Sequence, residues 1–190
     1  MRSFTFPARV VGVAILAAAL VLVTHFVAGP DLAAKGGHDR HVKIMDTCGP
    51  DFNMFVGPDT CSRSHGTHFL DFIAEVTQFG SAHHWRFDPE HDNAEVGDTL
   101  VARNHGGEFH TFTEVEEFGG GFVQDLNDLA GVFDPALLTP RTECLTLPDE
   151  DFLPPGGTDR EDVVEEGTLK FQCCIHPWMQ YKAHVKKKKK

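Results

Sequence analysis

Hydrophobic residues recur at helical spacing in one short segment of the chain. Four apolar side chains fall at i, i+3, i+4 and i+7, which places them on one face of a helix; they are Phe69, Phe72, Ile73 and Val76. Gly80 follows directly and is a typical helix end. The pattern predicts one short amphipathic helix whose apolar face packs against the rest of the protein.

From Trp85 onward the pattern changes to short runs of β-branched and aromatic residues separated by turn residues. Several short strands with Gly and Pro turns, and only one clear helix, are typical of an antiparallel sandwich or barrel. We therefore expect an all-β fold. Its strands are expected near residues 85–87, 99–104, 111–115, 161–164, 168–175 and 181–185.

Two segments do not follow the strand rhythm. Residues 35–66 are rich in Gly, Asp, Pro and Ser, and we expect an ordered loop or arm there. Residues 116–158 hold Gly119-Gly120-Gly121 and several prolines, which predict a long loop insertion with a helical turn near residues 126–129. The expected organisation is an arm with a short helix at 35–80 and a β domain at 81–185.

The first 34 residues have the pattern of an export signal. Arg2 and Arg9 precede an apolar run at residues 10–23, which suits a secretory signal and is short for a membrane span. Leu32-Ala33-Ala34 is a small-residue cleavage site, and an uncleaved membrane anchor is the alternative. Either way the body is expected to be periplasmic or secreted, where disulfides persist.

The charge balance excludes one class of function. Residues 35–185 hold 27 acidic and 10 basic residues, so the body lacks the basic face that nucleic acid binding requires.

Lys186–Lys190 form a terminal polylysine tail, expected to be solvated or, alternatively, in contact with anionic lipid. Most of the 12 histidines are expected to be solvated, although a second metal site is an alternative for those in the arm, His38, His41, His65 and His68.

The segment after the strand expected at 168–175 carries the chemistry. Cys173, His176 and Met179 place a thiolate, an imidazole and a thioether within seven residues. A thiolate, two imidazoles and a weak axial Met are the ligands of an electron-transfer copper site. The second histidine must come from elsewhere in the chain. His110 is the best candidate because it follows a Gly-Gly turn and precedes a strand, and His105 is the alternative.

These motifs resemble those of the cupredoxins, the blue-copper family that includes plastocyanin and azurin. The resemblance covers the C-terminal hundred residues and rests on Val-Gly-Asp-Thr-Leu at 96–100, on His110, and on Gly-Thr-Leu at 167–169 leading into Cys-x-x-His-x-x-Met. It implies a Greek-key β-sandwich or barrel that binds one type 1 copper ion. The implied ligands are His110, Cys173, His176 and Met179.

The chain differs from the family at two points. Many cupredoxins have Asn or Ser after the first histidine, where the side chain links the two ligand loops, and this chain has Thr111. It also has adjacent cysteines, Cys173 and Cys174. In an extended strand Cys173 shares the core face with Leu169 and Phe171, so Cys174 points to the other face.

Once Cys173 is assigned to the metal, four cysteines remain, and they allow three pairings. The simplest hypothesis joins Cys48 to Cys61 across a short loop, and Cys144 to Cys174 so that the insertion is held beside the metal strand.

The resemblance implies an exported one-electron carrier whose electron gateway is His176, with Pro177 and Trp178 either as an apolar rim around an exposed ring edge or in ordinary packing. A copper carrier or buffer that delivers the ion is the alternative. An enzyme is not expected, because oxidases of the family use His-x-His pairs and the chain has none. An acidic patch could steer a basic redox partner to the metal; its residues are Glu114, Glu116 and Glu117.

Overall fold

The protein is seen here in a computed structural model that describes residues 37–188, so the expected signal or anchor at 1–34 lies outside the described residues. Among the described residues, no helix has the length and apolar character needed to cross a bilayer. The described residues cluster as one compact unit.

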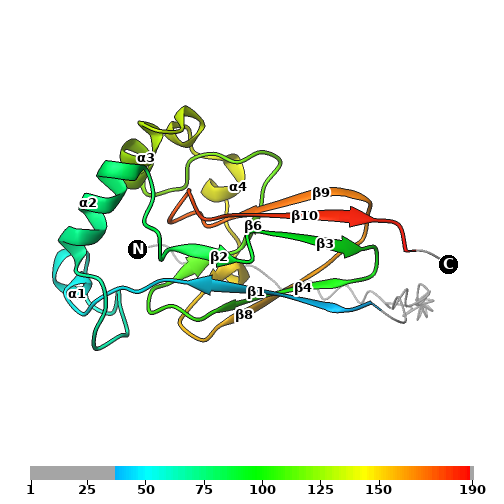
Figure 1. Ribbon diagram of the computed structural model, residues 1–190, viewed down its shortest axis with the longest axis horizontal. Coiled ribbons are helices and arrows are strands. Elements are labelled where there is room, and N and C mark those ends of the chain that lie inside the picture. The colour runs from blue at the N-terminus through cyan, green and yellow to red at the C-terminus, as the bar shows by residue number, and fades with distance from the viewer. Residues whose placement is uncertain (1–36, 189–190) are drawn as a thin grey trace, which may run out of the picture. The chain divides into compact units, whose positions relative to one another are not determined.

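The unit is a β-sandwich of two four-stranded sheets, with a small two-stranded ribbon beside them (Figure 1). The first sheet has the order β2 (Arg86–Asp88), β1 (Asp39–Met45), β4 (Thr99–Asn104), β8 (Thr158–Asp162). The second has the order β3 (His91–Glu95), β10 (Gln180–Lys186), β9 (Gly167–Gln172), β6 (Thr113–Glu114). The ribbon pairs β5 (His110–Thr111) with β7 (Phe152–Leu153).

The core lies between the two sheets and is largely aromatic. Phe87 of the first sheet meets Phe112 at a ring distance of 5.5 Å, and Phe112 stacks on Phe171 of β9 at 4.3 Å. Tyr181 of β10 closes the same cluster and is fully buried. Alternation along the strands supplies these residues, because every second side chain of a strand faces the same side.

Strand β1 was not expected from the sequence. Residues 39–45 were expected in a loop or arm, yet they pair in parallel with β4 and antiparallel with β2. The pattern is weak because only Val42 and Ile44 are buried, while residues 39–41 and Lys43 are charged or polar. With β1 against β4 and β10 against β3, each sheet contains one parallel pair, so the sandwich is mixed rather than purely antiparallel.

The expected helix is present as α2 (Phe69–Phe79), with Phe72 and Val76 buried. Asp51 accepts a hydrogen bond from the backbone amide of Phe69 at 2.9 Å and so satisfies an unpaired donor of the first turn. The helix ends at Gly80, whose φ of 73° is left-handed. A Cβ at this position would meet the ring of Phe133, so both conformation and space require glycine there.

The insertion at 116–158 is more helical than the sequence predicted. Besides the expected turn, which is α3, it forms a further α-helix and two 3₁₀ helices. Asn127 of α3 is fully buried and exchanges two hydrogen bonds of 2.8 Å with the backbone of Gly121. The helices are α3 (Gln124–Gly131), η1 (Pro135–Leu138), α4 (Thr142–Leu145) and η2 (Asp149–Asp151), and a single-turn helix, α1 (Phe52–Phe55), lies in the arm.

The two ends of the sandwich differ. Helices α1, α2 and α3 gather at one end, where β9 stops and β10 starts (Figure 1). At the opposite end β1 starts and β10 stops beside the turn after β3. There the carbonyl of His38 accepts from the amide of Thr99, and that of Lys186 accepts from Val96.

Candidate metal centre

Three of the four ligand candidates lie together at the helical end of the sandwich. The Sγ atom of Cys173 lies 3.6 Å from Nδ1 of His110 and 3.8 Å from Nδ1 of His176. All three ligand atoms lie within 4.8 Å of one another. His110 and Cys173 have no exposed surface and His176 has 2 %, so the cluster is sealed from bulk water.

The sheet brings these residues together by simple pairing. Strand β6 pairs with β9, with Thr113 opposite Gln172, so His110 just before β6 lies beside Cys173 just after β9. A tight loop then carries His176 back over the thiol. The loop is closed by hydrogen bonds from the amide of Cys173 to the carbonyl of Met179 (3.0 Å) and from the amide of Met179 to that of His176 (2.9 Å).

Thr111 links the two ligand segments as the missing Asn or Ser would. Its Oγ1 accepts a hydrogen bond from the amide of Cys174 at 2.8 Å, and its own amide points at Sγ of Cys173 at 3.5 Å. Thr111 is fully buried. An amide directed at a thiolate stabilises its negative charge and fixes its direction.

Met179 is buried with 1 % of its surface exposed and is joined to the site by the two backbone hydrogen bonds that close the loop. Its role as the fourth ligand stays a prediction. His105, the alternative to His110, is exposed and outside the cluster of ligand atoms. The arm histidines are also exposed, and in residues 37–188 none of them belongs to a group that could hold a metal.

Asp46 is part of the site and was missed by the sequence analysis. It is fully buried, and its Oδ2 lies 2.9 Å from Nε2 of His110. It also accepts hydrogen bonds from the backbone amides of Cys48, Gly107 and Glu108 at 2.8 to 3.1 Å. A signal for it exists, because Asp46 follows Val42 and Ile44 at the spacing of two that marks the core face of β1.

The carboxylate determines which nitrogen of His110 is available. Since Nε2 faces Asp46, Nδ1 is left facing Cys173, where a metal ligand is needed. Burial alone raises the pKa of Asp46, but hydrogen bonds from His110 and from the amides of Gly107 and Cys48 outweigh it and hold the pKa well below its usual range. Asp46 is therefore a permanent negative charge behind His110.

His110 and Cys173 also shift each other's pKa. Burial lowers the pKa of His110, but Asp46 and Cys173 outweigh burial and raise it to about 10. Burial likewise raises the pKa of Cys173, yet contacts with His110 and His176 bring it well below its usual range. Both shifts favour a thiolate beside an imidazolium, an arrangement that presents negatively charged sulfur to an incoming metal cation.

This donor set fits copper. Two imidazole nitrogens and one cysteine sulfur converge within one metal's reach at a buried site, and soft sulfur with imidazole suits copper far better than calcium or magnesium. A second group, formed by Asp46, Cys48 and Glu108, lies beside it. The sulfur of Cys48 is already held in a disulfide, so that group offers only carboxylates.

The cysteines are paired as the sequence analysis expected. Cys48 is bonded to Cys61 and Cys144 to Cys174, with Cα atoms 6.0 and 5.3 Å apart, and Cys173 is free. The second disulfide holds helix α4 against the residue next to Cys173. The odd cysteine is thus the one in the candidate centre.

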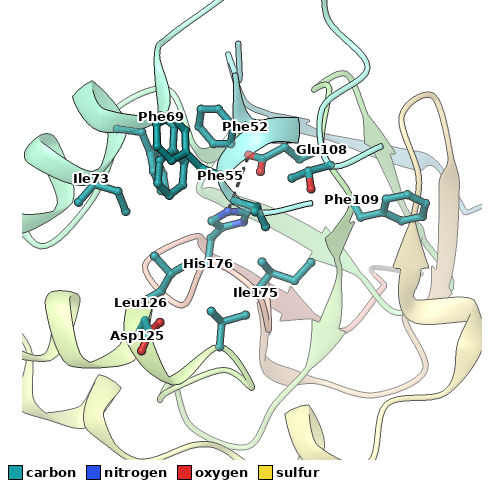
Figure 2. Close-up of a pocket in the computed structure, with 14 residues that line it drawn as sticks. Phe52, Phe55, Phe69, Ile73, Glu108, Phe109, Asp125, Leu126, Ile175 and His176 are labelled. Atoms are coloured by element: carbon teal, nitrogen blue, oxygen red, sulfur yellow. Dashed lines mark ion pairs between the residues drawn. The ribbon is translucent and has the colours of Figure 1, made fainter. Parts of the chain in front are cut away.

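The ring of His176 is covered, which differs from the exposed edge considered above. Trp178 approaches it at a ring distance of 5.6 Å and Phe72 of α2 at 6.1 Å. Glu108 lies on the Nε2 side at 3.9 Å, as the dashed line in Figure 2 shows. Burial raises the pKa of Glu108 above its usual range, although the nearby histidines oppose the shift.

The acidic patch near the site is partly neutralised. Glu114, Glu116 and Glu117 are exposed, and the carboxylate of Glu117 forms an ion pair of 2.7 Å with Lys170. As a docking face for a basic partner the patch stays a prediction.

No protein-family profile and no curated protein matches this sequence. Among solved structures, the chain is similar to a purple cupredoxin from Nitrosopumilus maritimus, with 14 % identity, a TM-score of 0.40, and coverage of 78 % of this chain and 100 % of that one. It is also similar to plastocyanin from Dryopteris crassirhizoma, with 14 % identity, a TM-score of 0.39, and coverage of 77 % and 100 %.

An amicyanin variant in its reduced state is similar at 20 % identity and a TM-score of 0.35, covering 53 % of this chain and 73 % of that one. These likenesses are distant and concern the arrangement of strands.

Proposed function

We propose that this protein binds one copper ion through His110, Cys173, His176 and Met179, and that it acts as a one-electron carrier rather than as an enzyme. The observation that carries the proposal is the convergence of two imidazole Nδ1 atoms on the single free thiol of the described chain, with Sγ to Nδ1 distances of 3.6 and 3.8 Å. A copper ion held by such ligands supplies one-electron redox chemistry.

The surrounding residues favour a carrier because they hold the ligands still. Thr111 joins the two ligand segments, Asp46 holds the ring of His110, and the loop hydrogen bonds fix His176 over Cys173. Fixed ligands keep the same coordination geometry in both oxidation states of the metal, so little rearrangement accompanies electron transfer. Burial of His110 and Cys173 also keeps water and exogenous ligands away from the thiol side of the cluster.

Burial favours retention over delivery of the ion. A carrier that hands copper to a partner needs ligands that the partner can reach, and here His110 and Cys173 have no exposed surface. Retention can be tested by challenge with a modest copper chelator. A carrier of electrons keeps its copper and cycles reversibly, whereas a copper-delivery protein loses it readily.

The main test is titration of the purified protein with cupric ion, read by optical absorption and electron paramagnetic resonance. We expect an intense visible thiolate charge-transfer band and narrow copper hyperfine splitting, since the thiolate is in the ligand set. Cys173→Ser should abolish the band while the circular dichroism spectrum is retained. A colourless copper complex in the unaltered protein would contradict the proposal.

A matched control uses a histidine that lies near the site in sequence but is exposed. His105→Ala should leave the band unchanged, because His105 lies outside the cluster. His110→Ala should abolish it. Equal loss of the band in both variants would mean that the assignment of His110 is wrong.

We further propose that the protein is exported and exchanges electrons with a partner that has a basic docking face. The two disulfides support an oxidising compartment. Residues 35–185 hold 27 acidic residues against 10 basic ones, and this net negative charge supports attraction of a basic partner.

A further inference from the structure

A pocket of about 460 Å³ opens beside His176 at the helical end of the sandwich. Helices α1, α2 and α3 form its sides, and the ring of His176 and the carboxylate of Glu108 lie at its floor (Figure 2). Its volume suits a small molecule. The function proposed above does not use this pocket, because the metal ligands meet on the other side of His176.

The walls are aromatic. Phe52, Phe55, Phe69 and Phe72 line the pocket, and the rings of Phe55 and Phe69 stack at 5.0 Å. Phe52 and Phe72 are almost fully buried, while Phe55 is 47 % exposed at the pocket mouth. Such walls favour an apolar body, and the faces of aromatic rings also attract cations.

Two carboxylates line the pocket, together with the hydroxyl of Thr60 and the ring of His176. Oε2 of Glu108 accepts a hydrogen bond of 2.6 Å from the indole of Trp85, whereas Oε1 has no hydrogen-bond partner among residues 37–188. A second carboxylate, Asp125, lies at the rim, and no lysine or arginine lines the pocket. A carboxylate oxygen without a protein partner at the floor of a pocket can accept a hydrogen bond from a ligand, and an ammonium group is the strongest donor.

We propose that this pocket binds a small organic cation, with its ammonium group against Oε1 of Glu108 and its apolar or aromatic body between the phenylalanines. An anion is disfavoured by two carboxylates and by the net negative charge of the body. A neutral analogue makes the same apolar contacts but leaves the charge of Glu108 uncompensated.

The ligand would control the proposed electron carrier. It contacts His176, and it places a positive charge beside Glu108, whose carboxylate lies 3.9 Å from Nε2 of His176. A positive charge there disfavours the more positive oxidised state, so the reduction potential should rise. This consequence rests on the proposed function, whereas binding itself requires only the pocket.

The binding test uses phenethylammonium as probe, with 2-phenylethanol and phenylacetate as neutral and anionic counterparts of similar size. Isothermal titration calorimetry on the metal-free protein at pH 8 keeps the copper site out of the measurement. We expect phenethylammonium to bind at least about tenfold more tightly than 2-phenylethanol, and phenylacetate to bind more weakly still. Equal binding of the cation and the alcohol would overturn the proposal.

Two variants localise the site. Glu108→Gln keeps an acceptor for Trp85 and should abolish the preference for the cation. Phe55→Ala removes an exposed wall residue and should weaken binding of both probes, whereas Leu145→Ala, exposed on α4 and outside the pocket, should not. Binding that survives both pocket variants would refute the assignment, and Phe55→Ala keeps the test valid should Glu108→Gln fail to fold.

A second readout separates this inference from the proposed function. In copper-loaded protein, phenethylammonium should raise the reduction potential, and Glu108→Gln should remove the shift. Cation-selective binding without a coloured copper site would refute the electron carrier and leave the pocket assignment intact. A coloured site without cation binding would refute only the pocket assignment.

Discussion

At the scale of single residues, Asp46 has the largest influence on the candidate centre. Its fully buried carboxylate accepts hydrogen bonds from three backbone amides and is also hydrogen-bonded to Nε2 of His110. It thereby connects the end of β1 to the turn before β5 and selects the free nitrogen of a ligand. Gly106 lies against it so closely that a Cβ there would collide with the carboxylate.

The prediction for Asp46 is a loss of both stability and metal affinity. Asp46→Asn should lower the free energy of unfolding by about 1–3 kcal/mol, since a donor is left unsatisfied in the core. Copper affinity should fall roughly 10- to 100-fold, because His110 loses the partner that orients it. Urea unfolding of the metal-free protein and competition with a chelator measure the two effects separately.

Asp98 is the matched control for Asp46. It is also buried, with 3 % exposed, and it accepts from the amides of His38 and Glu95 and from Arg40. It lies at the opposite end of the sandwich. Asp98→Asn should therefore destabilise the fold by a similar amount and leave copper affinity unchanged. A similar loss of affinity in both variants would show that Asp46 acts through general stability.

At the scale of elements, local patterns were predictable and long-range pairings were not. Helix α2 follows from its apolar stripe, and the loop from Cys173 to Met179 follows from ligand spacing within one segment. Strand β1 was missed because only two of its residues mark the core face. Its pairing with β4 joins positions about sixty residues apart, and no local signal specifies it. Asp46 was missed together with β1, because its spacing of two from Val42 and Ile44 marks the core face only once the segment is recognised as a strand.

The helices of the insertion at 116–158 were only partly predictable, and the physical reason differs from that for β1. The buried polar residue Asn127 stabilises α3 through the backbone of Gly121. A polar residue at a core position breaks the apolar periodicity that identifies a helix. Helix α4 has one turn and is held by the disulfide at Cys144, which a periodic pattern cannot reveal.

The two disulfides should contribute unequally to stability. Closing a longer loop removes more conformational entropy from the unfolded chain, and the sequence separations are 13 for Cys48–Cys61 and 30 for Cys144–Cys174. Replacing both cysteines of a pair by alanine should cost about 3 kcal/mol for the first and about 3 to 4 kcal/mol for the second. Urea unfolding of the two double variants tests the order.

Thiol counting checks the pairing itself. Unfolding the unaltered protein without reductant should expose one reactive thiol, and peptide mapping should place it at Cys173. Free thiol at Cys174 would contradict both the pairing and the choice of metal ligand.

At the scale of the whole molecule, carboxylates from different elements lie close enough together to raise the pKa of one of them. Partial burial raises the pKa of Glu161 on β8 to about 7, and the neighbouring carboxylates Asp159, Asp151 and Glu114 add to the shift. These groups come from three different elements of the fold. The folded state therefore holds a proton at Glu161 that the unfolded chain has already lost near neutral pH.

The sign of the effect follows from proton linkage. Because the pKa of Glu161 is higher in the folded state, the contribution of Glu161 to stability decreases as pH rises from about 4.5 to about 7 and then levels off. Glu161→Gln should stabilise the protein at pH 8 by less than about 1 kcal/mol, since the side chain is partly solvated, and should have little effect at pH 4. Unfolding curves at both pH values measure this difference.

Glu166→Gln is the control for charge alone, since Glu166 is exposed and does not contribute to the shift at Glu161. The same gain at pH 8 in both variants would attribute the effect to net charge rather than to the carboxylate cluster.

The separation of Lys186 from the candidate centre along β10 has a consequence for electrochemistry. Strand β10 starts next to Met179 and stops at Lys186, seven residues later, which is about 20 Å of extended chain. If the protein is attached to an electrode through Lys186, the candidate centre lies at the other end of β10, and electron tunnelling over that distance is slow. Attachment through an engineered cysteine at an exposed position of α2, such as Leu70, shortens that path and should give much faster interfacial electron exchange.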